Sequence, residues 1–431
     1  MTYKITAILH GQDKNNGDYY HRVLWPYQAL SEHAYVEIVQ MTHPDVYLKA
    51  AQAEILLVHM IADEGLLQII QHRKKMGRPT ITEISDDFKN FPSSTMLHHF
   101  YADPNNQRII EDFMTFSDGV QFSSPFLQQK YRIYNSKTNV YMNQLWEIPL
   151  PQQKEIKKPL RLGWVGSGGH VLDAKELAAF LQKCPSLKNY SFSIMTTQEI
   201  ASIFINAGID VDHQPTGDFE EYLQFISSLD IGIAHVIEED FALGRSDGKY
   251  LEYTTQGVIS ICTNRGTFAS TIRHGENGYT YTTAEELETI LELITKDRSI
   301  IQEIRQNAYQ DLKENRNHRI AVVEKHRWYQ SFLPSNPDKT TAWCPQLQFE
   351  QHPIEEELKK LLEEHNYHPQ PNLLDRYKEI AKRCPHSNYT WQGLHLLAKQ
   401  FGWKKEQRMF EKMDQKTHLD ALQKALDWRG I

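Results

Sequence analysis

The chain has 431 residues, which is too long for one ordinary core and predicts two or three domains. Its 47 lysine and arginine residues against 55 aspartate and glutamate residues give a net charge of −8, so no overall basic field exists to hold a nucleic acid. Four cysteines far apart in the sequence favour reduced thiols over a disulfide framework or a zinc site. No signal-peptide pattern and no apolar run of about 18 residues occur, so we expect a cytoplasmic protein without a transmembrane helix.

Short apolar runs alternate with helical patterns in the first part of the chain. The runs have the length and composition of buried strands and lie at residues 4–10, 35–40, 55–59, 79–84 and 119–122. After the last run, Ser124 and Pro125 have the residue types that begin a helix. This alternation predicts a Rossmann-like domain with a parallel sheet over residues 1–150.

The same alternation restarts after a proline- and lysine-containing stretch at 149–159, which is typical of a linker. Further strand patterns lie at residues 161–165, 191–195, 231–234 and 258–262. We therefore expect a second Rossmann-like domain over 160–315 and a return helix over 316–333. A break at 334–345 and helical patterns beyond it predict a helical extension over 340–431.

The predicted fold class is α/β, with two tandem Rossmann-like, doubly wound domains and a C-terminal helical extension. Two-domain dehydrogenases, periplasmic binding proteins and GT-B glycosyltransferases all share this layout. The layout alone therefore does not decide the function.

A glycine-rich turn follows the strand pattern at 161–165. Gly166, Gly168 and Gly169 let the backbone turn tightly, and the helix that follows offers N–H groups to a phosphate or carboxylate. A tight strand–helix turn without any ligand explains these glycines equally well. Val171 interrupts the full GxGxxG pattern, so a nicotinamide cofactor is disfavoured.

A charged segment at 241–253 follows the strand pattern at 231–234. Arg245 and Lys249 offer the fixed cations that a diphosphate needs, and Glu252 offers a carboxylate for the hydroxyls of a ribose. On the residues alone, a solvated loop that caps a helix is the simpler interpretation.

With its flanking motifs, this segment resembles a known family. Residues 162–170 resemble the opening of the second domain in retaining GT-B glycosyltransferases of the family-4 type, and residues 245–253 resemble their donor-binding segment. Residues 257–260 and 275–279 are similar to the next two motifs of that family, a buried strand and a tight glycine turn. Weaker likenesses at 20–30 and 83–87 extend the resemblance over about residues 1–333.

The resemblance implies a metal-independent, retaining transfer of sugar from a nucleotide-diphosphate sugar, with no other cofactor. Arg245 and Lys249 would stabilise the leaving diphosphate as catalytic residues. Ser246 and the three glycines would bind the donor, and Glu252 would orient its ribose. A second family glutamate is missing, because Gly244 occupies its position.

The first domain would hold the acceptor, which is a carbohydrate, a lipid-linked sugar or a protein. The resemblance implies that His59 contacts the donor sugar. A purely structural, hydrogen-bonded role explains a histidine at this position as well. Arg22, Asp86 and Asp87 are the acceptor-side candidates, and a helix cap or surface ion pairs explain the two aspartates equally well.

Two other functions stay open. A GT-B nucleotide-sugar epimerase or hydrolase would use the same donor pocket, and a non-catalytic module would only bind the nucleotide sugar. No histidine or carboxylate spacing predicts a metal site, and we interpret Asp210-Val211-Asp212 as a coincidental DxD spelling. The helices of the extension need a packing partner, so the extension covers the catalytic domains, builds an oligomer, or receives an acceptor or a partner.

Overall fold

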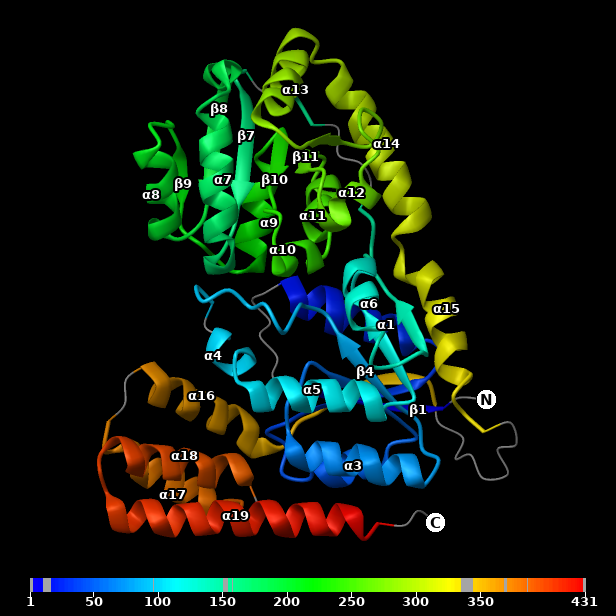
Figure 1. The fold of residues 1–431 in the computed structure, drawn as a ribbon, viewed down its shortest axis with the longest axis vertical. Helices are drawn as coiled ribbons and strands as arrows, with labels where there is room; N and C mark the ends of the chain where they lie inside the picture. The colour runs from blue at the N-terminus through cyan, green and yellow to red at the C-terminus, as the bar shows by residue number, and fades with distance from the viewer. Residues whose placement is uncertain are drawn as a thin grey trace.

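The computed structural model describes residues 3–10, 17–95, 97–149, 154–156, 158–334, 344–367, 370–385 and 387–428. It contains two parallel β-sheets with helices on their faces, which form the lower and upper halves of the molecule in Figure 1. The predicted α/β class with two tandem Rossmann-like units is confirmed. Most of the break predicted at 334–345 lies outside the described residues, as do residues 150–153 and 157 of the break predicted at 149–159.

Within the described residues, the first sheet has seven strands, and every neighbouring pair is parallel. In spatial order the strands are β13 (Gln346–Glu350), β2 (Tyr35–Gln40), β1 (Lys4–Leu9), β3 (Ile55–His59), β4 (Thr80–Ile84), β5 (Gly119–Phe122) and β6 (Thr138–Val140). The five strands expected in this half are confirmed. Strand β13 was not predicted, and it lies within the extension that the sequence indicates as helical.

The second sheet has six strands among the described residues, again all parallel. Their order is β12 (Tyr279–Tyr281), β11 (Ile259–Thr263), β10 (Ile231–Ala234), β7 (Leu160–Val165), β8 (Tyr190–Met195) and β9 (Asp212–Gln214). The four expected strands form the centre of this sheet, and the short strands β9 and β12 are its edges.

Helices connect the strands in both halves. Those of the first half are η1 (Tyr19–Leu24), α1 (Trp25–Leu30), α2 (Val46–Gln52), α3 (Glu64–Lys75), α4 (His98–Tyr101), α5 (Pro104–Phe116) and α6 (Pro125–Tyr131). Those of the second half are η2 (Gly168–His170), α7 (Val171–Leu181), η3 (Pro185–Asn189), α8 (Gln198–Asn206), α9 (Phe219–Ser227), α10 (Asp240–Gly244), α11 (Gly248–Thr255), α12 (Gly266–Thr271) and α13 (Ala284–Lys296). Helix α6 begins as predicted, because the Ser124 hydroxyl accepts a hydrogen bond from the Leu127 N–H.

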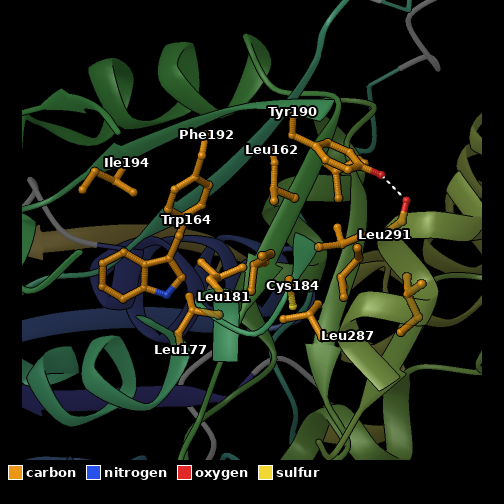
Figure 2. Close-up of a cluster of buried hydrophobic side chains, with 14 of the residues drawn as sticks. Leu162, Trp164, Leu177, Leu181, Cys184, Tyr190, Phe192, Ile194, Leu287 and Leu291 are labelled. Atoms are coloured by element: carbon orange, nitrogen blue, oxygen red, sulfur yellow. Dashed lines mark hydrogen bonds between the residues drawn. The ribbon is translucent and has the colours of Figure 1, made fainter. Parts of the chain in front are cut away.

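The core of the second half lies between its sheet and helices α7 and α13 (Figure 2). Trp164 and Phe192 from the strands pack with Leu177 from α7 and Leu287 from α13, and all four are buried. Full burial of side chains of this size contributes about 1.5–3 kcal/mol each. The rigid sheet that results fixes the loops at the ends of β7 and β10.

The chain returns to the first half through α14 (Ile300–Asn315) and α15 (His318–Gln330), which run along one side of both halves in Figure 1. Helix α15 packs on α1, and the hydroxyl of Tyr329 donates a hydrogen bond to Gln121 Oε1 at 2.6 Å. The return helix is therefore built into the first half.

The last helices are α16 (Pro353–Tyr367), α17 (Leu373–Arg383), α18 (Asn388–Gln400) and α19 (Lys404–Leu426). They share a small apolar core and lie at the lower left in Figure 1, with α19 running below α3. Leu422 and Ala425 of α19 enter the apolar cluster of α2 and α3, and Arg78 stacks on Trp428 at 4.3 Å from the ring centroid. The extension therefore covers the first half of its own chain.

Candidate functional site

A cavity of about 760 Å³ lies between the two halves. The first half contributes η1 and the segment after β4, and the second half contributes the loops after β7 and β10 together with α11. Ligands of open parallel sheets bind beyond the carboxyl ends of the strands. We call this space the cleft cavity. A smaller cavity of about 240 Å³ shares Gly17, Lys249 and Glu252 with it.

The glycine turn after β7 forms one wall of the cleft cavity. A Cβ atom at Gly166 would lie 2.4 Å from Trp164, so this glycine is needed for packing, and it lines the smaller cavity only. Gly168 and Gly169 line the cleft cavity, where a Cβ atom at Gly169 would lie 3.5 Å from Arg245 Nη2. Gly169 therefore brings the backbone close to the Arg245 side chain.

Arg245 lies at the cleft cavity beside His170. Its Nη1 donates to the His170 ring, 2.8 Å from Nε2, while His170 Nδ1 lies 2.7 Å from Asp173 Oδ2. Burial and the Arg245 charge lower the pKa of His170 to about 4, so the ring is neutral near pH 7 and accepts this hydrogen bond. Among the described residues no carboxylate pairs with Arg245, which leaves its charge available to a ligand.

Lys249 and Glu252 lie one turn apart on α11. Lys249 Nζ donates to the Tyr222 hydroxyl at 2.9 Å and lies 3.9 Å from Glu252 Oε2. Glu252 also accepts a hydrogen bond from Tyr222 and lies 3.2 Å from His21 Nε2, which comes from the first half. Burial alone would raise the pKa of Glu252, but Lys249, His21 and Tyr222 together lower it to about 2. Glu252 is therefore a carboxylate at neutral pH.

Ser246 and Arg22 are joined across the cleft by Asn143. The Asn143 amide donates to Ser246 Oγ at 3.0 Å, and its carbonyl oxygen accepts from Arg22 Nη1 at 3.2 Å. Arg22 also forms a buried ion pair with Glu83. Arg22, an acceptor-side candidate, lines the cleft cavity, but most of its donors are already bound within the protein.

Asp86 and Asp87 are neighbours with different surroundings. Asp86 lines the cleft cavity, where burial and Asp18 raise its pKa to about 7 against the lowering effect of Arg245. Asp87 points into the protein, where its carboxylate accepts from Tyr131 and lies 2.7 Å from Lys130 Nζ. Asp87, unlike Asp86, does not line the cleft cavity, because these partners hold its side chain inside the first half.

His59 does not line the cleft cavity. Its side chain is buried, and Nε2 lies 2.9 Å from Ser85 Oγ. The geometry favours the structural interpretation of this histidine over a contact with the donor sugar.

Several cavity residues were not identified from the sequence. His21, Asn143 and His170 hold Glu252, Ser246 and Arg245 in place through contacts between distant parts of the chain. No spacing pattern marks such contacts in advance. His170 does stand at the end of the glycine turn, where its position next to the predicted helix start was the one available signal.

Within the described part of the chain, no group of three or more histidine, cysteine, aspartate or glutamate side chains is placed to hold a metal ion. Asp212 lies on the edge strand β9, is exposed, and pairs with Arg161 at 3.0 Å. It does not line either cavity of the site. None of the described helices is long and apolar enough to cross a membrane.

No family model and no curated protein matches the sequence. Solved structures do match. The crystal structure of Anabaena HepE in complex with UDP and glucose aligns at 13% identity with a TM-score of 0.55, covering 76% of this chain and 99% of HepE. A glycosyltransferase from Rickettsia africae aligns at 14% identity with a TM-score of 0.54, and the alignment covers 78% of this chain and 100% of that protein. Sucrose-phosphate synthase from Thermosynechococcus elongatus aligns at 12% identity with a TM-score of 0.57, and the alignment covers 76% of this chain and 98% of the synthase.

These neighbours share their fold with this chain, and the fold is that of GT-B glycosyltransferases. The expected GT-B architecture is therefore confirmed. About a quarter of this chain lies outside each alignment, whereas almost the whole of each neighbour is covered.

Proposed function

We propose that the protein is a glycosyltransferase that moves a sugar from a nucleotide-diphosphate sugar to an acceptor. The observation that carries the proposal is the meeting of Arg245, Lys249 and the ionised Glu252 at one wall of the cleft cavity. HepE with UDP and glucose, and an α-glucosyltransferase with UDP and DNA, are neighbours that support this choice of donor.

We place the donor on the second half, residues 160–315, and the acceptor on the first half, residues 1–150. The smaller cavity offers space for the nucleoside, and the cleft cavity offers space for the diphosphate and the sugar. Glu252 lines both cavities, which supports its assignment to the ribose at their junction. Ser246 and the turn at Gly168 and Gly169 would contact the phosphates and sugar.

Transfer by this arrangement needs no protein-bound metal ion. As the bond between sugar and diphosphate breaks, negative charge grows on the diphosphate, and Arg245 and Lys249 lie where they can offset it. We propose retention of the anomeric configuration. On the acceptor side, Asp86 combines a cavity position with a pKa raised to about 7, which suits a group that accepts the proton of an acceptor hydroxyl.

The reaction products test the proposal directly. The protein is incubated with a panel of nucleotide-diphosphate sugars and with mono- and oligosaccharide, lipid-linked and peptide acceptors, and products are identified by mass spectrometry. A glycosylated acceptor is the expected result. An isomerised or hydrolysed sugar without transfer would instead assign the epimerase or hydrolase function, and binding without any product would assign a binding module.

Glu252→Gln weakens binding of a nucleoside monophosphate by about tenfold, because a neutral amide accepts hydrogen bonds from a ribose less strongly than a carboxylate. Calorimetric titration measures the change. Glu199→Gln on the exposed face of α8 is the matched control, and it leaves binding unchanged. Unchanged binding in Glu252→Gln would show that this carboxylate serves only His21, Tyr222 and Lys249.

Chelation by EDTA leaves the transfer activity in place. Arg245 and Lys249 neutralise the negative charge of the diphosphate, and both remain in place when divalent cations are removed. The rate of product formation is compared before and after dialysis against EDTA. Loss of turnover that manganese or magnesium restores would contradict the metal-independent mechanism.

A further inference from the structure

A third cavity, of about 380 Å³, lies where the chain crosses from α14 to α15 back into the first half. Its walls come from η1, from residues 140–142, from the end of α14 and from the first turns of α15. We call it the crossover cavity. His21 and Arg22 line it as well as the cleft cavity, so the two spaces adjoin.

Lys325 lies on the wall of the crossover cavity with an exposed fraction of only 7%. Among the described residues, its Nζ has neither a hydrogen bond nor an ion pair. Its surroundings are instead aromatic, since Nζ lies 5.1 Å from the Tyr141 ring centroid and 5.9 Å from that of Tyr329. A buried charge without a partner is costly, so this lysine needs a counterion.

The other buried groups do not supply that counterion. Burial lowers the pKa of Lys325, whereas the negative charge of the buried Glu83 raises it. However, Arg22 already neutralises Glu83 in a buried ion pair. Two carboxylates, Glu314 and Glu324, line the cavity, and both are exposed to solvent at its rim. The buried walls therefore carry a surplus of one positive charge.

Two histidines that line the same cavity each have a buried ring nitrogen without a hydrogen-bond partner among the described residues. His318 is 6% exposed, and its Nε2 has no partner among the described residues. His21 is 3% exposed, and its Nδ1 has none either, while its Nε2 faces Glu252. Burial and Lys325 lower the pKa of His318 to about 2, so its ring is neutral at pH 7. A neutral imidazole still has one N–H that can donate to an anionic oxygen.

We propose that the crossover cavity is a binding site for a phosphate group, held by Lys325 and by His318 and His21. The phosphate would accept charge-assisted hydrogen bonds from the lysine and the imidazoles. The cavity has room for inorganic phosphate or for the phosphate end of a small monoester. The site shares His21 with the cleft cavity, whereas Lys325 and His318 line the crossover cavity and not the cleft cavity, and the inference does not rest on the proposed function.

The test uses the full-length protein with Arg245→Ala as background, because this removes one of the cleft cations that would also attract phosphate. Calorimetric titration with inorganic phosphate is expected to show saturable binding, and Lys325→Met is expected to weaken it by about tenfold or more. Arg327→Met, an exposed cation on the same helix, is the matched control and leaves binding unchanged. Glu324→Gln is expected to strengthen binding, because it removes a negative charge from the rim.

Titration with glycerol 3-phosphate distinguishes the two sources of the phosphate group. Tighter binding of this monoester than of inorganic phosphate identifies a phosphorylated metabolite, and the reverse identifies free phosphate. If Lys325→Met does not fold, His318→Gln replaces it in the same comparison. Equal phosphate affinity in the Lys325 or His318 variant and its background, or no saturable binding at all, would overturn the proposal.

Discussion

Arg245→Ala and Lys249→Ala each weaken binding of a nucleoside diphosphate by about ten- to hundredfold, since a hydrogen bond to a charged group contributes about 1.5–3 kcal/mol. Both cations line the cleft cavity, and their protein partners are mainly neutral groups, His170 for Arg245 and the Tyr222 hydroxyl for Lys249. Arg245 has no carboxylate partner among the described residues, and Lys249 lies 3.9 Å from Glu252 Oε2, so we expect both cations to be able to interact with a diphosphate in this cavity. Calorimetric titration of the purified variants measures the loss.

Two controls make this result specific. Lys175→Ala removes an exposed cation from α7 and is expected to leave binding unchanged. Arg245→Lys keeps the charge but loses the planar fork of donors, so it is expected to bind between wild type and Arg245→Ala. Wild-type affinity in both alanine variants would show that the diphosphate does not bind at this wall.

Arg316→Met lowers the free energy of unfolding by about 3–5 kcal/mol, because it leaves a buried carboxylate without its cation. Asp247 is fully buried and pairs with Arg316, which is 8% exposed, and Asp247 Oδ2 also accepts from Thr271 Oγ1 at 2.6 Å. Arg316 Nη1 donates to the Asn143 carbonyl at 2.9 Å. This network ties the chain crossing to the start of α11, the helix that carries Lys249.

Urea denaturation of wild type and variant measures the difference. Lys313→Met, an exposed substitution on α14, changes stability by less than about 0.5 kcal/mol. The double variant Asp247→Asn with Arg316→Met is expected to lose less than the sum of the two single variants, since the two side chains form one unit. Additive losses would contradict the assignment of a coupled buried pair.

The central strands were predictable from the sequence, because each is an apolar run buried on both faces. Strand β3 (Ile55–His59) and strand β10 (Ile231–Ala234) are fully buried and were expected within a residue of their bounds. Strand β13 (Gln346–Glu350) was not, because it lies at the sheet edge with half-buried or exposed side chains and alternates polar with apolar residues. Its pairing with β2 depends on chain geometry over more than 300 residues, which no local pattern carries.

Part of the candidate site was also predictable, because a local sequence pattern marks it. Arg245, Ser246, Lys249 and Glu252 stand within one short segment, and the local pattern of charges was enough to select them. Asp86 and Asp87 are adjacent and chemically identical, so only the packing of Tyr131 and Lys130 around Asp87 separates their environments. The contact of His21 with Glu252 joins two halves of the chain and could be found only from the fold.

The most direct test of a nucleotide-sugar site in this GT-B fold is a thermal-shift measurement of the full-length protein against a panel of nucleotide-diphosphate sugars. A ligand present at about 100 times its dissociation constant adds about 2.7 kcal/mol to the free energy of unfolding, which raises the melting temperature measurably. We expect at least one nucleotide-diphosphate sugar to raise it, and the rise to disappear in the variant that carries both Arg245→Ala and Lys249→Ala. No shift with any member of the panel, or an equal shift in that double variant, would contradict the account.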